Sequence, residues 1–122
     1  MLAEDNDLNA EIAQFILEDM GLMVDRVEDG VQCVARMEQK PAGTYDLILM
    51  DIQMPNMDGY KATQAIRRLA DKKKAGIPII AMTANAFEED ARKCVEAGMN
   101  AHLSKPLQMD VVVDTIAQYY KR

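Results

Sequence analysis

Carboxylate, hydroxyl and ammonium side chains stand at or just past the ends of several short strand-like segments of this sequence. The residues concerned are Glu4, Asp5, Asp51, Thr83 and Lys105. Carboxylates that lie close together do not all ionise unless a cation neutralises them, and Mg²⁺ is a hard, oxygen-binding ion that needs few protein carboxylates. With an ammonium and a hydroxyl beside it, such a group would form a site for a phosphoryl group. Asp51 would attack phosphorus, while Mg²⁺ and Lys105 would hold the oxygens on which negative charge develops.

Asp51 closes the strongest strand signal in the chain. Residues 47–50 are all apolar, show no helical spacing and precede the turn-forming residues of 55–59, which predicts a short strand buried on both faces. Asp51 would therefore stand at the edge where open parallel sheets bind ligands. A carboxylate in that position is costly to bury unless a cation meets it.

Strand-like and helix-like segments alternate along the whole chain. The pattern predicts strands at 1–3, 23–27, 46–51, 77–82 and 100–103, and helices at 8–20, 30–39, 59–74, 87–97 and 109–120. Asp7 and Asp58 are the expected N-caps of the first and third of these helices. The alternation favours one α/β domain over residues 1–122, with a parallel sheet between helices. Since parallel strands end at one edge, the polar residues would meet there, although each alone has an ordinary explanation as a cap, turn or surface residue.

The composition excludes several partner classes. The formal net charge is −6 and the estimated pI is 4.7, which disfavours direct contact with nucleic acid or an anionic membrane. No apolar run reaches the roughly 18–20 residues of a membrane span, and no signal peptide is visible. Cys33 and Cys94 lack metal-ligand spacing and are expected to be buried, reduced thiols of a cytoplasmic protein. The basic group formed by Arg67, Arg68 and 72–74 is expected to be a solvated helix end.

Four motifs, in this order and spacing, resemble those of a known family. Glu4-Asp5-Asn6, Met50–Gly59, Ala81–Ala84 and Lys105-Pro106 resemble the signature of receiver domains of two-component response regulators, and the match covers nearly the whole chain. The resemblance implies a flavodoxin-like (βα)5 fold, a three-layer sandwich whose parallel five-stranded sheet has the order 2-1-3-4-5. It also implies a phosphoprotein that works in a phosphorelay.

The resemblance assigns a role to each residue of the acidic group, which consists of Glu4, Asp5 and Asp51. Asp51 would be the phosphoacceptor. Asp5, Asp51 and the backbone carbonyl of Gln53 would ligate Mg²⁺, and Glu4 would assist through a water molecule.

The resemblance also implies a conformational switch. Thr83 would close on the phosphoryl group and Lys105 would pair with it, and family members commonly have a cis peptide bond at the position of Lys105-Pro106. The family's switch aromatic, three positions before this lysine, is usually Tyr or Phe, whereas here it is His102. Two interpretations stay open: a working switch that turns inward, and a half-buried histidine on a short strand.

The residues of these motifs most resemble those of one subset of the family. Gly59–Thr63 and Ala81–Ala86 resemble receiver domains attached to hybrid histidine kinases, which implies a module of a larger sensor protein, with a stand-alone receiver as the alternative. The phosphodonor would be a histidine kinase or a histidine phosphotransfer protein, docking near Asn9 and Ala13. The domain is not expected to be an enzyme, although it would catalyse its own phosphorylation and dephosphorylation. Because the family has several more residues before the acidic pair, the first strand is expected to be truncated at the N-terminus.

Three alternatives compete with this interpretation. Phosphatases of the haloacid-dehalogenase type also use an Asp nucleophile, Mg²⁺, a Thr or Ser and a Lys, but they place a second Asp two residues after the nucleophile as general acid. Here that position is Gln53, which is no useful proton donor near neutral pH. A flavin or nucleotide site is disfavoured because no Gly-rich phosphate-binding motif follows any strand. A docking module that works without phosphorylation is the third, and the complete set of phosphorylation residues argues against it.

Overall fold

The computed structural model describes residues 1–84 and 88–119. The strands are β1 (Leu2–Ala3), β2 (Arg26–Val27), β3 (Ile48–Asp51), β4 (Ile79–Thr83) and β5 (Ala101–Ser104). The helices are α1 (Asp7–Asp19), α2 (Gly30–Gln39), α3 (Gly59–Arg67), α4 (Lys72–Ala75), α5 (Glu88–Ala97) and α6 (Met109–Tyr119). The predicted first residue of the helix at 87–97 and the predicted last residue of the helix at 109–120 lie outside the described residues.

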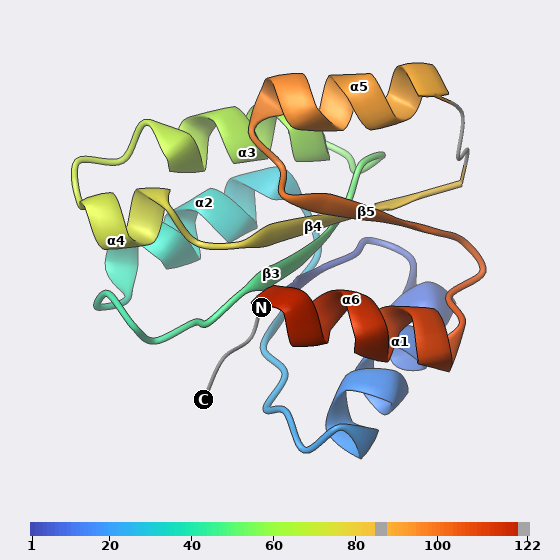
Figure 1. Cartoon of the computed structure of the whole chain (residues 1–122). Coiled ribbons are helices and arrows are strands. Elements are labelled where there is room, and N and C mark those ends of the chain that lie inside the picture. Colours follow the sequence, from blue (N-terminus) through green and yellow to red (C-terminus); the bar gives the residue numbers. More distant parts are fainter. Residues whose placement is uncertain (85–87, 120–122) are drawn as a thin grey trace.

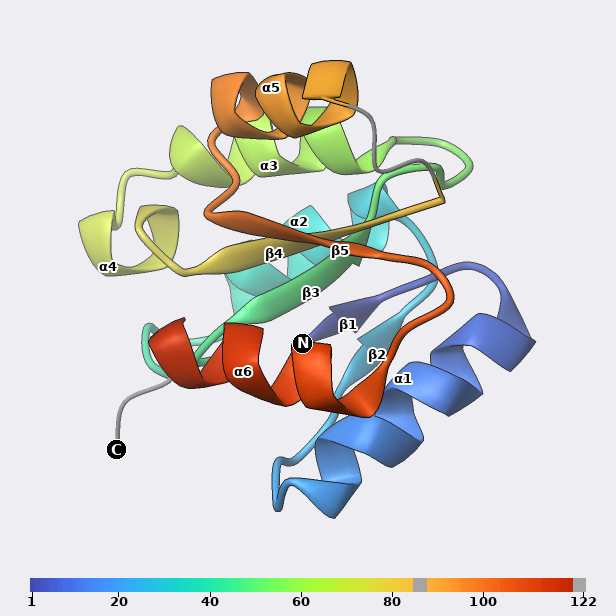
Figure 2. The same ribbon diagram turned by 45° about the vertical axis from the view of Figure 1, so that its right-hand side comes forward.

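The five strands form one parallel sheet in the order β2-β1-β3-β4-β5. This confirms the expected flavodoxin-like arrangement. Helices α2, α3 and α5 cover one face of the sheet, and α1 and α6 cover the other (Figure 1). The turned view keeps the same three layers (Figure 2). Because every strand pair is parallel, the carboxyl ends of β1, β3, β4 and β5 open on a single edge.

Side chains of β3 alternate between two cores. Ile48 and Met50 pack into the cluster that also holds Cys33 and Cys94, beneath α2, α3 and α5. Leu49 packs on the opposite face with the apolar side chains of α1 and α6. All three β3 residues are 0% exposed, which confirms the prediction of a strand buried on both faces. Both cysteines are buried and neither forms a disulfide, as expected.

The first helix is capped one residue earlier than predicted. Asn6, not Asp7, is the N-cap: its backbone is extended, and its Oδ1 accepts the backbone N–H of Asn9 at 3.0 Å. Asp7 is instead the first helical residue, where a carboxylate is favoured by the helix dipole and also pairs with Arg26 at 3.0 Å. The predicted cap at Asp58 is correct, since its carboxylate accepts the N–H of Lys61.

The predicted helix at 59–74 is wrong in its second half. Helix α3 ends at Arg67, and a separate short helix α4 begins at Lys72. Asp71 causes the break, because its side chain accepts the backbone N–H groups of Lys73 and Lys74 and so starts a new helix. The predicted strand at 23–27 is likewise shorter, with only Arg26–Val27 paired to β1.

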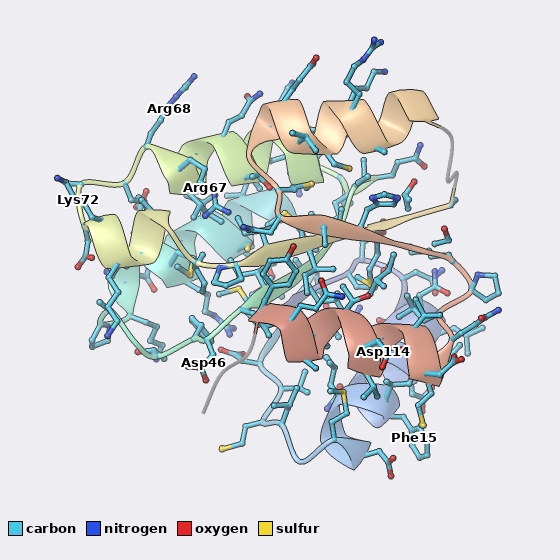
Figure 3. All side chains as sticks on the ribbon, in the orientation of Figure 1. Phe15, Asp46, Arg67, Arg68, Lys72 and Asp114 are labelled. Atoms are coloured by element: carbon cyan, nitrogen blue, oxygen red, sulfur yellow. The ribbon has the colours of Figure 1, made fainter. Side chains whose placement is uncertain are left out.

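Arg67 is not part of a solvated helix end, contrary to the prediction. Figure 3 shows Arg68 pointing away from the molecule, whereas Arg67 lies on the sheet side of α3. The acceptors of the Arg67 guanidinium, at 2.6 to 2.9 Å, are the carbonyls of Ala75, Ile77 and Gly98 and the side chain of Asn100. One charged group therefore holds α3, the connection from α4 to β4 and the connection from α5 to β5 together.

Replacing Arg67 should destabilise the fold far more than replacing its neighbour. Arg67→Ala leaves the carbonyls of Ala75, Ile77 and Gly98 without this donor, so we expect a loss of about 2–4 kcal/mol in the free energy of unfolding. Arg68→Ala, which removes the same charge from an exposed site, should change it by less than about 0.5 kcal/mol. Urea unfolding followed by circular dichroism measures both, and equal losses would contradict the assignment.

In the described part of the chain, no helix combines the length and the apolar character that crossing a membrane requires.

Candidate functional site

The polar residues singled out in the sequence stand at the ends of four different strands. Glu4 directly follows β1, Asp51 is the last residue of β3, Thr83 is the last of β4, and Lys105 directly follows β5. They line a cavity of about 510 Å³ at the carboxyl edge of the sheet, together with Asp5 and Gln53. The predicted strand ended at residue 82 and placed Thr83 in the loop after it. Thr83 is instead the last residue of β4. The strand order therefore brings the predicted phosphorylation and metal-binding residues together at one edge.

Lys105 lies between two buried carboxylates. Its Nζ is 3.1 Å from Oε2 of Glu4 and 3.1 Å from Oδ2 of Asp51. Glu4 is 1% exposed and Asp51 is 5% exposed, so this ammonium supplies the cation that Asp51 was expected to require. Burial lowers the pKa of Lys105, but the ion pairs with Asp51 and Glu4 outweigh it and hold the pKa above its ordinary value. The peptide bond between Lys105 and Pro106 is cis.

One ammonium does not satisfy the whole acidic group. Burial, followed by the charge of Asp51, raises the pKa of Glu4 to about 7 even though Lys105 opposes the shift. Oε2 of Glu4 is buried and accepts no hydrogen bond of good geometry from the described residues. Glu4, Asp5 and Asp51 each offer a carboxylate oxygen, and these oxygens lie within 4.8 Å of one another. Such a set of hard oxygen donors fits a small divalent cation.

Arg26 fixes the acidic turn from outside the cavity. Its Nε and Nη2 donate to the backbone carbonyl of Glu4 at 3.1 and 2.9 Å, and its Nη1 pairs with Asp7. The backbone N–H of Glu4 donates to the carbonyl of Val27 at 3.1 Å. No local pattern predicts this role, because Arg26 lies 22 residues from Glu4 along the chain.

The loop after Asp51 folds back over the strand that it leaves. Gly59 donates its backbone N–H to the carbonyl of Ile52 at 2.8 Å. A Cβ at Gly59 would lie only 3.0 Å from Cα of Ile52 and closer still to the carbonyl oxygen of Asp51, so no other residue fits without a shift. This close return keeps Gln53 and Asp58 on the wall of the cavity.

Thr83 is held against the segment that carries Lys105. Its carbonyl accepts the backbone N–H of Lys105 at 2.8 Å, and it pairs with Ser104 in the sheet register. The side chain is buried, with 7% of the residue exposed. The hydroxyl-bearing residue and the ammonium-bearing residue are therefore neighbours across β4 and β5.

Two expectations about the surroundings of the site are wrong. His102 is exposed on β5, so the interpretation of a half-buried histidine does not hold. Ala13 is 1% exposed on α1 and cannot contact a partner. The exposed side chains of that helix include three large apolar ones, and Asn9 lies on the cavity wall. Leu8, Ile12 and Phe15 are 65%, 44% and 66% exposed.

Two further residues of the cavity wall were not singled out in the sequence. Lys93 reaches the wall from α5, and Tyr60 reaches it from the first turn of α3. Neither stands at the end of a strand, as Asp51 and Thr83 do. Helical residues enter such a site only through the packing of their helix, and the sequence carries no direct mark of that.

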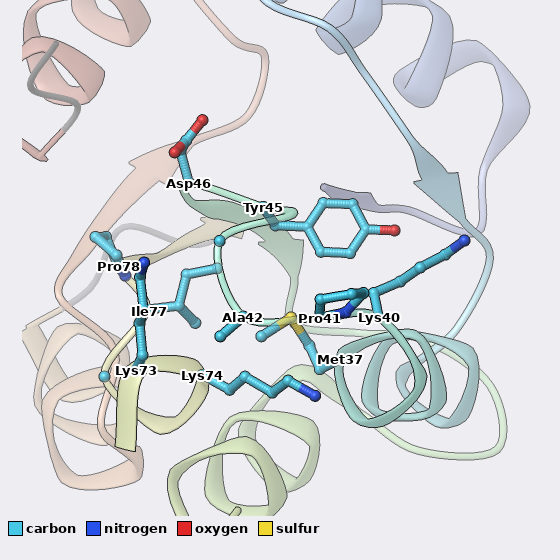
Figure 4. Close-up of a pocket in the computed structure, with 12 residues that line it drawn as sticks. Met37, Lys40, Pro41, Ala42, Tyr45, Asp46, Lys73, Lys74, Ile77 and Pro78 are labelled. Atoms are coloured by element: carbon cyan, nitrogen blue, oxygen red, sulfur yellow. The ribbon is translucent and has the colours of Figure 1, made fainter. Parts of the chain in front are cut away.

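A second cavity, of about 290 Å³, lies near the start of β4 (Figure 4). Its wall includes Lys40, Lys73, Lys74 and Asp46, and Nζ of Lys74 donates to the carbonyl of Glu38 at 3.0 Å. It contains none of the residues predicted to do chemistry. We therefore place the functional site at the carboxyl edge of the sheet.

Sequence comparison shows that this chain is similar to known proteins. The sequence model of a family described as the response regulator receiver domain matches residues 1–117. Histidine kinase 1 of Arabidopsis thaliana is 38% identical over 151 residues, covering 99% of this chain and 12% of that protein. Hybrid signal transduction histidine kinase L of Dictyostelium discoideum is 39% identical over 124 residues, covering 99% of this chain and 7% of that protein. The chain thus spans only a small part of the length of these relatives.

A solved structure shares the fold. It is the receiver domain of a sensor histidine kinase from Pseudomonas aeruginosa, crystallised with a magnesium ion coordinated in the active site cleft. It is 39% identical, covers 97% of this chain and 93% of its own, and superimposes with a TM-score of 0.85. By the family match over residues 1–117 and by the order of its sheet, this chain belongs to the response regulator receiver domain family.

Proposed function

We propose that residues 1–122 form one receiver domain in which Asp51 accepts a phosphoryl group from a phosphohistidine. The observation that carries this proposal is the arrangement at the end of β3, where Asp51 meets one ammonium and two further carboxylates. Lys105 lies 3.1 Å from Asp51, and Glu4 and Asp5 offer oxygens within 4.8 Å of it. A nucleophile, a fixed positive charge and a set of hard oxygen ligands are the requirements of phosphoryl transfer.

In the proposed reaction a carboxylate oxygen of Asp51 attacks phosphorus. The P–N bond of the phosphohistidine breaks, and its electron pair stays on the imidazole. Lys105 already lies beside Asp51, so its ammonium would contact the negatively charged phosphoryl oxygens with little movement of the side chain. Water later hydrolyses the acyl phosphate, so the domain would catalyse its own phosphorylation and dephosphorylation without turning over a separate substrate.

We further propose that the acidic group holds Mg²⁺. Asp5, Asp51 and the backbone carbonyl of Gln53 would be its protein ligands, with Glu4 acting through a water molecule. The carboxylate oxygens of Glu4, Asp5 and Asp51, which lie within 4.8 Å of one another, and the position of Gln53 on the same cavity wall support this assignment. When bound, the ion would neutralise charge that develops on the phosphoryl oxygens. The relative from Pseudomonas aeruginosa, with magnesium in the corresponding cleft, is consistent with this choice of metal.

Gln53 argues against the phosphatase alternative. Haloacid-dehalogenase-type enzymes need a general acid two residues after the nucleophile, and an amide cannot fill that role near neutral pH. The family match favours the receiver as well. The presence of the nucleophile, the ammonium and the acidic group around one cavity also argues against a docking module that works without phosphorylation.

For the conformational response we propose the pair Thr83 and His102. A phosphoryl group on Asp51 would draw the Thr83 hydroxyl toward it and leave space behind the end of β4. His102, which starts from an exposed position on β5, would then turn inward. The face formed by α5, β5 and α6 would repack and be read by a partner.

The proposed phosphodonor is a histidine kinase or a histidine phosphotransfer protein, and the proposed parent is a hybrid histidine kinase acting in the cytoplasm. The relatives named above and the buried cysteines Cys33 and Cys94, neither of which forms a disulfide, support these assignments. We propose that the donor docks on the exposed apolar residues of α1, Leu8, Ile12 and Phe15. They lie on the helix that begins directly after the acidic turn.

Acetyl phosphate tests the proposed function without a known donor. In the presence of Mg²⁺ the wild-type protein should gain one phosphoryl group, measured by intact mass, because Asp51 would supply the nucleophile. The same incubation with EDTA should give no gain, since Lys105 alone cannot neutralise Glu4, Asp5 and Asp51. Equal phosphorylation in both samples would contradict the metal site, and no phosphorylation in either would contradict the function.

A further inference from the structure

A hydrogen-bonded contact joins the loop after Asp51 to the start of α2. Nδ2 of Asn56 donates to Oδ2 of Asp29 at 2.8 Å, and the backbone N–H of Gly30 donates to the carbonyl of Met57 at 3.1 Å. The partners of each bond are 27 residues apart in the chain. We call this pair of bonds the loop latch.

On the α2 side of the latch, the backbone at Gly30 leaves no room for a side chain. A Cβ at Gly30 would lie 3.0 Å from Cβ of Met57 and closer still to its carbonyl oxygen, so only glycine allows the two segments to approach. Asp29 is 7% exposed, and its other carboxylate oxygen caps α2 by accepting the N–H of Gln32 at 2.8 Å. Both hydrogen bonds lower the pKa of Asp29, and the bond from the Gln32 N–H has a larger effect than the bond from Asn56. The contact with Gln32 therefore holds the Asp29 side chain on α2 independently of its contact with the loop.

The loop side of the latch carries backbone strain. Asn56 has a φ of 67°, a left-handed conformation that costs free energy in residues other than glycine. Its side-chain amide bonds to Asp29 from this conformation, so the latch stabilises the turn that Asn56 makes. Gln53 lies between this turn and Asp51, on the wall of the cavity.

We propose that Asp29 and Gly30 are positioning residues, which hold the loop so that the backbone carbonyl of Gln53 faces the metal site. The inference rests on the proposed function of that site. Neither residue lines the cavity, so each acts only through the loop. Partners outside the first ligand shell orient metal ligands, and their removal typically weakens metal affinity about 10- to 100-fold.

Two variants that leave the net charge unchanged test the proposal. Asn56→Gly keeps the left-handed conformation available while removing the amide that bonds to Asp29. Gly30→Ala forces Met57 away from α2. The matched control is Asn100→Gly, which removes a side-chain acceptor of Ile79 at the start of β4, the opposite edge of the sheet.

The readouts are Mg²⁺ affinity, from an NMR titration of the ¹⁵N-labelled protein, and stability, from urea unfolding. Asn56→Gly and Gly30→Ala should bind Mg²⁺ about tenfold more weakly than wild type, whereas Asn100→Gly should lose stability and keep the wild-type affinity. Unchanged affinity in both latch variants, or an equal loss in the control, would overturn the inference. Failure of the wild-type protein itself to bind Mg²⁺ would instead overturn the proposed function.

A measurement on the wild type keeps the proposal falsifiable if the latch variants do not fold. If the latch favours metal binding, metal binding must favour the latch by the same factor. The Gly30 amide, which donates to Met57, should therefore exchange with solvent more slowly when Mg²⁺ is added. An exchange rate that does not respond to Mg²⁺, in a protein that binds the ion, would overturn the inference.

Discussion

Asp51→Asn should abolish the gain of a phosphoryl group from acetyl phosphate. The amide has nearly the shape of the carboxylate, so the loop after β3 keeps its packing although Lys105 loses one of its two ion pairs. An amide oxygen is too weak a nucleophile to form the acyl phosphate. Intact mass after incubation with Mg²⁺ measures the effect. The expected result is complete loss of the phosphorylated species.

Asp58→Asn is the matched control for this loss. Asp58 lies in the same loop, lines the same cavity and carries the same charge, but its carboxylate caps α3 by accepting the N–H of Lys61 at 2.8 Å. Asparagine is an equally good N-cap, so this variant should fold and gain one phosphoryl group as the wild type does. Phosphorylation that survives Asp51→Asn, or that is lost only in Asp58→Asn, would contradict the assignment of the nucleophile.

Lys105→Ala should slow phosphorylation by acetyl phosphate about 100-fold. Its ammonium is the charged donor nearest to Asp51 among the side-chain contacts described, and removing one preorganised donor from such a site typically costs a factor of that order. The rate is measured by intact mass at a series of times. Arg68→Ala, which removes an exposed positive charge far from the cavity, should leave the rate unchanged.

A second readout separates this effect from loss of the metal. Removing a positive charge beside Glu4 and Asp51 reduces repulsion of a divalent cation, so Lys105→Ala should bind Mg²⁺ at least as tightly as wild type. Slow phosphorylation with intact metal binding would then locate the role of Lys105 at the phosphoryl oxygens. Equal rates for Lys105→Ala and Arg68→Ala would remove Lys105 from the site.

The site could be predicted because its signals are local. An apolar run that ends in a charged or hydroxyl residue predicts both a buried strand and the side chain at its end, as at Asp51 and Thr83. The order of the strands was implied only by the family resemblance. Once it is given, convergence of these residues at one edge follows from parallel topology.

What could not be predicted depends on contacts between distant segments. The periodicity of residues 59–74 favoured one helix, and nothing local shows that Arg67 turns inward to bind carbonyls at and just past the ends of α4 and α5. The same holds for Asp29 and Asn56, which are ordinary turn residues until the fold places them together. Asn6 and Asp7 are both good caps, and only the backbone conformation of Asn6 decides between them.

Chemical trapping of the phosphoryl group tests the central claim most directly. Borohydride reduces an acyl phosphate of aspartate to homoserine, so peptide mass mapping after incubation with acetyl phosphate reports which carboxylate carried the group. Homoserine should appear at Asp51 alone, and only when Mg²⁺ is present, because the acidic group around Asp51 would need the ion to admit another anion. Homoserine at Asp5 or Asp58, or at Asp51 to the same extent without Mg²⁺, would contradict the account.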